Sequence, residues 1–243
     1  IRLSIAGSTE PRELDYSIGM AGSFNQANSL VALACIEAVT GESLTSESKA
    51  VQALTDVQVP GRMQLVEEGQ DFLAMVDYAH KPGAVQAVLG SLHDYLPDPE
   101  ARIGIVLGAG GNRDHDKRAI MGRIATELAD AVFITDDNPR DEEPSAIREA
   151  IYVGAREGVQ KKEQEQPTNG ETVCEIVPDR AEAIAAAVAW ARPGDAVVVA
   201  GKGHEKGQLV AGTMHPFDDV EELAEALKNR VRQEHEAPQE RPQ

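Results

Sequence analysis

Polar and charged residues that could bind a ligand gather in four segments, each directly after a short apolar run. The segments cover residues 77–82, 108–114, 135–140 and 201–205. If the apolar runs are strands of one parallel sheet, these segments lie at its carboxyl edge, where open α/β sheets bind ligands. The chemistry available there is recognition of charge, because the segments carry carboxylates, guanidinium and ammonium groups, amides and glycines.

The segment 135–140 places two carboxylates, an amide and a guanidinium within six residues, and Pro139 stiffens it. One interpretation is a site for a zwitterion, in which Arg140 binds a carboxylate and Asp137 holds an ammonium group. The other interpretation is a surface loop with a local Asp–Arg pair. The segment taken alone leaves both open.

The segment 77–82 leads into a predicted helix. Pro82 suits the first turn of that helix, and the free backbone amides of a first turn favour an anion. The alternative is an ordinary strand-to-helix turn in which the side chain of Asp77 caps the helix.

Two glycine-rich segments resemble phosphate-binding loops without matching them. Segment 108–114 approaches the dinucleotide-binding fingerprint, but Arg113 stands where that pattern needs a third glycine. In segment 201–205, Lys202 lies between glycines, but the Walker spacing and a following Ser or Thr are missing. Taken singly, segment 108–114 is best interpreted as a turn that brings the backbone close to another element, and segment 201–205 as a simple turn.

The elements that must position these segments alternate between strands and helices after a Pro-Gly turn at residues 60–61. Strands are predicted at 63–66, 72–76, 103–107, 131–135, 174–177 and 196–200. Helices are predicted at 83–95, 117–129, 145–157, 180–191 and 219–231, and a solvated loop at 159–172. Strands that are apolar throughout imply an α/β fold with a Rossmann-like, mainly parallel sheet and helices on both faces.

Residues 1–60 are predicted to form a separate unit, with a strand at 1–5 and helices at 25–38 and 45–54. Because the chain opens on a strand pattern without an initiator Met, we expect it to be cut from something longer. Residues 233–243 are rich in Glu, Gln and Pro and are predicted to be a disordered tail. The predicted domains are therefore 1–60 and 61–232, followed by the tail.

Composition excludes several classes of protein. The net charge of −18, from 41 acidic and 23 basic residues, disfavours nucleic acid as a partner. No run of about 18 apolar residues occurs, so no membrane span is predicted. Cys35 and Cys174 lack partners at ligand spacing, which predicts free, mostly buried thiols in a reducing cytoplasm. The scattered histidines support no metal site.

Taken together and in this order, the segments resemble the Mur ligase family, in particular its members that add meso-diaminopimelate to the peptidoglycan precursor. The resemblance runs from residues 22–28 through 59–62 and 77–80 to 201–205, and its most diagnostic part is the Asp-Asn-Pro-Arg sequence at 137–140. It implies that residues 1–60 are the end of a central ATPase domain and that 61–232 are the C-terminal, amino-acid-binding domain. The family's phosphate loop and catalytic lysine would lie upstream, so the chain alone is expected to be inactive.

The resemblance also implies an activity and a set of site residues. The activity is an ATP- and Mg²⁺-dependent amide ligase reaction in which UDP-N-acetylmuramoyl-L-alanyl-D-glutamate is activated as an acyl phosphate and joined to meso-diaminopimelate. The implied ATP-binding residues are Asn25, Asn28, Arg62, Asp77 and His80. The implied diaminopimelate-binding residues are Arg113, Asp137, Asn138, Arg140, Gly201 and Glu205. No catalytic residue is predicted within the chain, and the protein is expected to be a cytoplasmic monomer.

Three other functions remain as alternatives. One is a related amide ligase, either a lysine-adding enzyme or a folylpolyglutamate synthase, and Arg140 is the residue that discriminates it. Another is an amino-acid-binding domain without catalysis. The last is a nicotinamide-dependent oxidoreductase, which Arg113 disfavours because it breaks the glycine pattern.

Overall fold

The computed structural model describes residues 2–4, 13–20, 22–165 and 172–236. The chain forms two compact units that divide between Val59 and Pro60, beside the Pro-Gly turn. No helix within the described ranges is long and apolar enough to cross a lipid bilayer.

The first unit combines a pair of short strands with two helices. These elements are β1 (Arg2–Ser4), β2 (Glu13–Asp15), α1 (Ser23–Thr40) and α2 (Lys49–Ala53), and β1 pairs antiparallel with β2. Its core contains Leu14, Tyr16, Leu33 and Val51. Both helices were predicted, although α2 is shorter than the predicted 45–54, and β2 was not predicted.

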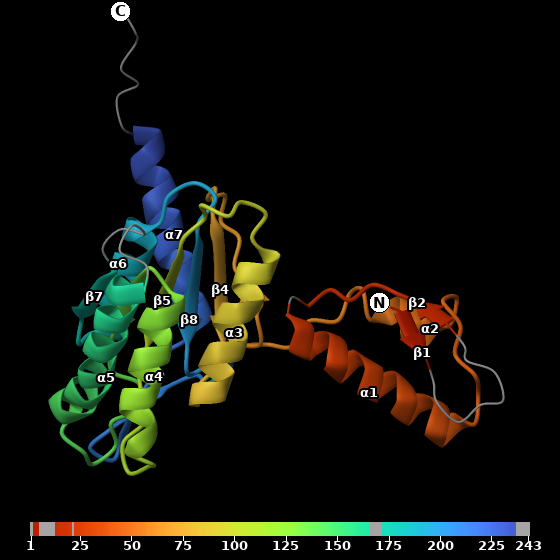
Figure 1. Ribbon diagram of the computed structural model, residues 1–243, viewed down its shortest axis with the longest axis horizontal. Coiled ribbons are helices and arrows are strands. Elements are labelled where there is room, and N and C mark those ends of the chain that lie inside the picture. The colour runs from red at the N-terminus through yellow and green to blue at the C-terminus, as the bar shows by residue number, and fades with distance from the viewer. Residues whose placement is uncertain (1, 5–12, 21, 166–171, 237–243) are drawn as a thin grey trace, which may run out of the picture. The chain divides into compact units, whose positions relative to one another are not determined.

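The second unit is built on a six-stranded sheet with the order β3-β4-β8-β5-β6-β7 (Figure 1). The strands are β3 (Gln64–Leu65), β4 (Leu73–Asp77), β5 (Ile103–Leu107), β6 (Ala131–Ile134), β7 (Val173–Ile176) and β8 (Ala196–Ala200). Only β3 runs antiparallel to its neighbour, and the other five strands are parallel. The prediction of a mainly parallel sheet is confirmed.

The register of the central strands aligns their carboxyl ends. β8, with the sequence Ala-Val-Val-Val-Ala, is buried along its whole length between β4 and β5, as suits β-branched residues in a sheet covered on both faces. Asp77 of β4 pairs with Ala200 of β8, and Leu107 of β5 pairs with the same residue. The segments that follow these strands therefore start side by side at one edge.

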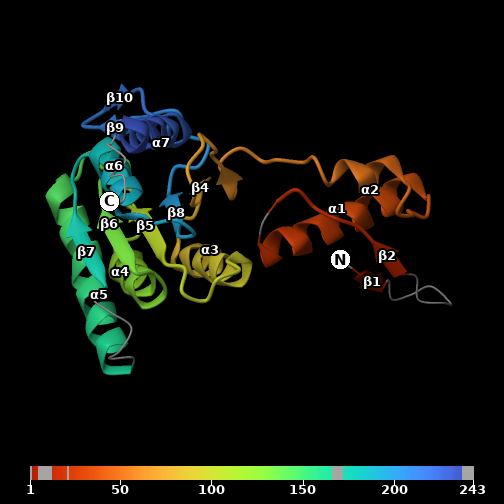
Figure 2. The ribbon, with the colours of Figure 1, turned by 90° about the horizontal axis from the view of Figure 1, so that it is seen from above.

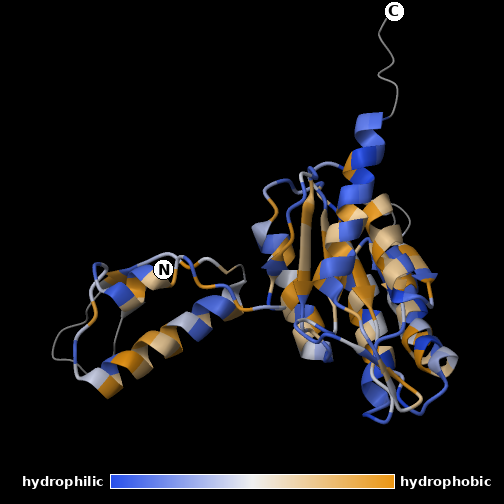
Figure 3. Cartoon of the chain, turned by 180° about the vertical axis from the view of Figure 1, so that it is seen from behind, coloured by the Kyte–Doolittle hydropathy of each residue, from blue (hydrophilic) through white to orange (hydrophobic). Residues whose placement is uncertain are grey.

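Helices cover both faces of this sheet, as predicted (Figures 1 and 2). One face carries α3 (Pro82–Tyr95), α4 (Asp116–Leu128) and α5 (Pro144–Glu165), and the other carries α6 (Arg180–Trp190) and α7 (Asp219–Glu236). Figure 3 shows hydrophobic strands at the centre of this unit and a largely hydrophilic α7. On the side of α6 and α7, Ile184 and Leu223 pack with Val76 and Val199 in a continuous core.

Two segments differ from the prediction. α5 continues to Glu165, so residues 159–165 are helical where a loop was predicted, because Lys, Glu and Gln form helices well without an apolar face. α7 continues to Glu236, so residues 233–236 of the predicted tail are helical. The remainder of that tail and residues 166–171 of the predicted loop lie outside the described residues.

A pair of three-residue strands and the burial of the cysteines were also not predicted correctly. β9 (Gln208–Val210) pairs antiparallel with β10 (Thr213–His215), and strands this short show no pattern in the sequence. Cys35 and Cys174 are both free, but Cys35 is exposed and Cys174 is half-buried. Cys35 is exposed because the residues that α1 buries are Asn25, Ser29 and Leu33.

Candidate functional site

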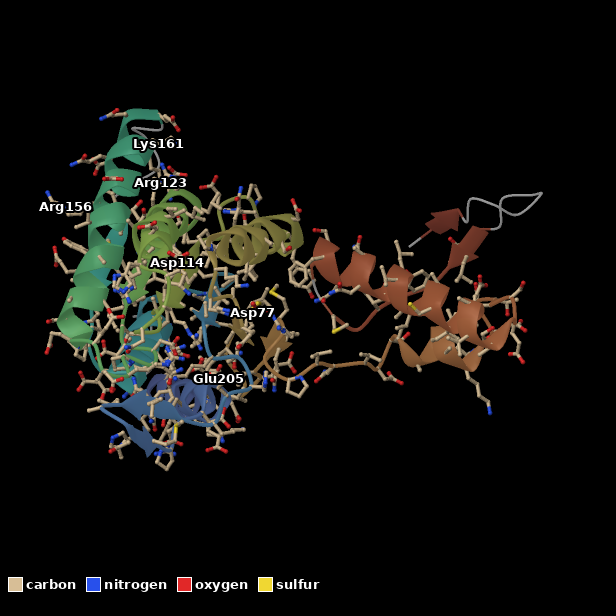
Figure 4. All side chains as sticks on the ribbon, turned by 90° about the horizontal axis from the view of Figure 1, so that it is seen from below. Asp77, Asp114, Arg123, Arg156, Lys161 and Glu205 are labelled. Atoms are coloured by element: carbon tan, nitrogen blue, oxygen red, sulfur yellow. The ribbon has the colours of Figure 1, made fainter. Side chains whose placement is uncertain are left out.

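A cavity of about 490 Å³ lies at the carboxyl edge of the sheet, within the second unit. Its walls come from the segments that follow β4, β5, β6 and β8, and Asp114 and Glu205 mark two of these walls in Figure 4. It is lined by Tyr78, His80, Lys81, Pro82, Gly110, Arg113, Asp114, Lys117, Asp137, Asn138, Arg140, Gly201 and Glu205. The structure thus brings all six residues of the implied diaminopimelate set, and His80 of the implied ATP set, to one cavity.

Arg140 is held by its backbone as well as by its side chain. Its φ of 54° is in the left-handed region, which is unfavourable for a residue with a Cβ. Its N–H donates to Leu209 O at 2.9 Å and its carbonyl accepts from Ala211 N at 2.6 Å, which binds the loop to β9. The guanidinium Nη1 donates to Gly111 O at 2.7 Å. Among the described residues Arg140 forms no ion pair with Asp137, so the local Asp–Arg pair is not observed.

Asp137 instead forms an ion pair with Lys202, a residue that the sequence analysis did not place in the site. Lys202 Nζ lies 3.0 Å from Asp137 Oδ1, and its side chain has no exposed surface. The same nitrogen donates to Asn138 Oδ1 at 3.1 Å and to Gly207 O at 2.9 Å. The only signal in the sequence was a lysine between two glycines directly after a buried strand, which was interpreted as a turn.

Glu205 connects two walls of the cavity. Its Oε2 accepts from Asn138 Nδ2 at 3.1 Å, and its Oε1 accepts from the Tyr78 hydroxyl at 3.3 Å. Burial raises the pKa of Tyr78 above its ordinary value, and the charge of Glu205 adds to this effect. The guanidinium of Arg62 lies 4.6 Å from the centre of the Tyr78 ring. Arg62 therefore contacts a residue of the cavity wall and does not itself line the cavity.

The Asp77 carboxylate binds two backbone N–H groups next to the segment that follows β4. Its Oδ2 accepts from Met63 N and its Oδ1 from Ala79 N, both at 2.8 Å. Burial raises the pKa of this carboxyl, and the two backbone hydrogen bonds oppose that effect. The N-cap of α3 is Lys81, which makes no side-chain capping bond. The alternative in which Asp77 caps the helix is therefore not observed.

The cavity is locally rich in cations although the whole chain has a net charge of −18. Lys81, Arg113, Lys117 and Arg140 line it together with three carboxylates. Lys117 Nζ donates to His80 O at 3.0 Å, and burial lowers the pKa of its amine. An anionic ligand would offset that cost, because a nearby negative charge favours the charged form of a lysine.

A buried ion pair contacts the backbone next to Gly201, which lines the cavity. Gly201 has a φ of 124°, which residues with a Cβ rarely adopt. The preceding carbonyl, Ala200 O, accepts from Arg180 Nη2 at 3.0 Å. Arg180 pairs with Asp219 through two hydrogen bonds of 2.7 and 2.8 Å, and both side chains are fully buried. Neither residue was predicted to belong to the site.

The two remaining residues of the implied ATP set belong to the first unit. Asn25 and Asn28 lie one turn apart on α1, and Asn28 Nδ2 donates to Asn25 Oδ1 at 3.4 Å. Asn25 is buried and Asn28 is exposed.

A mainly parallel α/β sheet with a charged cavity at its carboxyl edge defines a ligand-binding domain of the doubly wound class. Residues 61–203 match the family described as "Mur ligase, glutamate ligase domain". The chain therefore belongs to the Mur ligase family.

Individual relatives agree with this membership. Over 225 residues the chain is 48% identical to the UDP-N-acetylmuramoyl-L-alanyl-D-glutamate–2,6-diaminopimelate ligase of Corynebacterium glutamicum. The aligned residues cover 91% of this chain and 41% of that enzyme. A solved structure of a ligase with the same name is 32% identical and superposes with a TM-score of 0.61, covering 95% of this chain and 43% of that one. The chain thus spans about two fifths of the relatives it matches.

More distant structures share the fold alone. A folylpolyglutamate synthase of Mycobacterium tuberculosis, solved with ADP and AMPPCP, has 21% identity and a TM-score of 0.57 and covers 83% of this chain and 44% of that one. The fold by itself therefore does not separate these two kinds of enzyme.

Proposed function

We propose that this chain is the part of an ATP-dependent amide ligase that binds meso-diaminopimelate and presents its amine to an activated UDP-N-acetylmuramoyl-L-alanyl-D-glutamate. The reaction would belong to cytoplasmic peptidoglycan precursor synthesis. The proposal rests on the names of the 48% and 32% identical relatives together with the residues that line the cavity.

The observation that carries the proposal is the presence of both donors and carboxylates in the lining of one cavity. Arg140 and the Asn138 amide are donors suited to a carboxylate, and Asp137 and Glu205 are acceptors suited to an ammonium group. Meso-diaminopimelate carries such a pair at its distal end, whereas lysine carries the ammonium alone. Lysine would leave the guanidinium of Arg140 without its ligand, which makes Arg140 the discriminating residue.

The residues of this chain would act by holding and orienting groups. Placement of an amine against a reactive carbonyl supplies about 7–11 kcal/mol of rate enhancement in well-oriented systems. Lys81 and Lys117 supply further positive charge in the cavity, and preorganised cations stabilise a phosphoryl group as charge develops on it. These residues fit the phosphates of ATP, which when bound supplies the phosphoryl group for activation. The described residues include no group of three carboxylate, His or Cys side chains that could hold a metal, so we assign no residue to Mg²⁺.

Ligand titration of the 243-residue chain, followed by NMR, tests this function. We expect meso-diaminopimelate to shift signals of residues 137–140 and 205, and L-lysine to bind roughly 10-fold or more weakly, since it leaves a charged donor unpaired. Arg140→Ala removes a charge-assisted hydrogen bond worth about 1.5–3 kcal/mol, so diaminopimelate affinity falls roughly 10- to 100-fold. Arg156→Ala on α5 is the control, because this arginine lies outside the cavity, and it leaves affinity unchanged (Figure 4). Equal binding of both ligands, or binding of neither, would overturn the proposal.

A further inference from the structure

We propose that Lys202 is a positioning residue for the selection of the amino acid: it fixes the orientation of the Asn138 amide and thereby the order of donor and acceptor that the cavity presents. Lys202 does not line the cavity, so it acts through Asn138 and Asp137. The inference rests on the proposed function, since it concerns how the same cavity selects its ligand.

The ammonium group of Lys202 is fully committed. A lysine has three N–H donors and no acceptor. Three oxygens surround Nζ: Asp137 Oδ1 at 3.0 Å, Asn138 Oδ1 at 3.1 Å and Gly207 O at 2.9 Å. Its side chain is 0% exposed, so water cannot replace any of these partners. One buried point charge therefore joins the loop after β6 to both ends of the loop between β8 and β9.

This arrangement leaves the Asn138 amide only one favourable orientation. Its Oδ1 receives hydrogen bonds from Lys202 Nζ at 3.1 Å and from Leu209 N at 2.9 Å. Both partners are donors, so a flipped amide would place its NH₂ group against two further N–H groups. The amide nitrogen is consequently directed to Glu205 Oε2 at 3.1 Å and Asp137 Oδ1 at 3.2 Å.

The fixed amide sets the polarity of this end of the cavity. A donor, Asn138 Nδ2, lies next to an acceptor, the Glu205 carboxylate, and both residues line the cavity. A carboxylate beside an ammonium group matches this order, because the ammonium group can replace the Asn138 N–H at Glu205 Oε2 and that N–H can then donate to the carboxylate. A ligand with only an ammonium group takes the acceptor and leaves the N–H without one. Without Lys202, Asn138 Oδ1 keeps Leu209 N–H as its single donor, so the amide is held less firmly, and the buried charge of Asp137 loses its counterion.

The test uses Lys202→Met in the 243-residue chain, because methionine has a similar length and no N–H donors. The readout without ligand is the side-chain NH₂ signal of Asn138 in ¹⁵N-labelled protein, identified by its loss in Asn138→Asp. We expect one pair of slowly exchanging NH₂ proton signals at a single ¹⁵N shift in the wild type, and two such pairs or one broadened pair in Lys202→Met. The readout with ligand is the ratio of diaminopimelate to lysine affinity, which we expect to fall roughly 10-fold or more.

Two further variants separate a positioning role of Lys202 from a general loss of fold stability. Lys161→Met removes an exposed lysine of α5 that pairs with Glu127 at 3.1 Å, and it leaves both readouts unchanged (Figure 4). If Lys202→Met does not fold, it is combined with Asp137→Asn, which removes the buried carboxylate charge that has lost its counterion. The Asn138 side chain of this double variant is still expected to show two orientations.

The outcomes separate this inference from the proposed function. A general loosening of the fold would weaken both ligands alike, so an unchanged affinity ratio together with a single Asn138 signal overturns the positioning role. If the wild-type chain binds neither amino acid, the proposed function fails, and the ligand-free Asn138 signal alone decides whether Lys202 orients the amide.

Discussion

Replacement of Asp219 by asparagine will destabilise the second unit far more than the loss of a comparable ion pair at the surface. Asp219 and Arg180 form two hydrogen bonds of 2.7 and 2.8 Å, and neither side chain has exposed surface. The asparagine side chain would keep one acceptor but remove the charge, and its NH₂ group would face the guanidinium. Breaking a buried pair in this way costs about 3–5 kcal/mol, because the remaining charge cannot reach water.

The matched control is Glu234→Gln in α7. Arg230 Nε also lies 2.7 Å from the Glu234 carboxylate, but the Arg230 side chain is 20% exposed and the Glu234 side chain 52% exposed. The pair spans one helical turn, and exposed pairs of this kind contribute about 0.3–0.5 kcal/mol. Two ion pairs with the same Nε–O distance thus differ about tenfold in expected effect, mainly because of burial and also because the buried pair has a second hydrogen bond.

Urea denaturation followed by Trp190 fluorescence is the assay. Trp190 is the single tryptophan and ends α6, so its signal reports the second unit. We expect the free energy of unfolding to fall by about 3–5 kcal/mol in Asp219→Asn and by less than about 0.5 kcal/mol in Glu234→Gln. The double variant Arg180→Met with Asp219→Leu should regain most of the loss, because it leaves no charge buried. A loss below about 1 kcal/mol in Asp219→Asn would refute this account of burial.

Three further outcomes follow from packing and burial. Gly154→Ala should lower the free energy of unfolding by about 1–3 kcal/mol, because a Cβ there would lie 1.8 Å from Ala119 O of α4. A Cβ at Gly90 in α3 would meet no atom within 4 Å, so Gly90→Ala should raise the free energy of unfolding by about 0.5–1 kcal/mol. Denaturation curves of the two glycine variants measure these changes, and equal effects would contradict the packing argument. Burial raises the pKa of Cys174 to about 11, so at pH 8 only about 0.1% is thiolate. Iodoacetamide should therefore label exposed Cys35 well before Cys174, as mass spectrometry would show, and equal rates would contradict it.

The sheet could be predicted from the sequence where local pattern and tertiary position agree. The strands at 103–107 and 196–200 have the predicted bounds, because continuous apolar runs rich in β-branched residues are typical of strands covered on both faces. The convergence of the four segments was also predictable, because parallel strands carry their carboxyl ends to one edge. Periodicity gave no signal for residues 159–165, where helix propensity alone extends α5.

The partners of the buried charges could not be predicted in the same way. Lys202 and Asn138 are 64 residues apart, and Arg180 and Asp219 are 39 apart. No local pattern marks a lysine or arginine for burial, because the cost of desolvation is repaid by oxygens that only the tertiary fold supplies. A site described from motifs therefore contains the residues that face the ligand and omits those that hold them.

The sequence Asp-Asn-Pro-Arg at 137–140 illustrates this limit, because its geometry comes from a second segment. Asp137 is paired by Lys202, Asn138 is oriented by Lys202 and Leu209, and Arg140 is held in a left-handed conformation by Leu209 and Ala211. Three of the four residues of the motif thus take their positions from residues 202–211. A left-handed arginine and a buried lysine are each unfavourable in isolation, so they persist because the surrounding hydrogen bonds over-determine them. On the proposed function, recognition of an amino acid at this edge would therefore depend on two loops joined by one buried ammonium group, and the four residues of the motif would not be sufficient to define it.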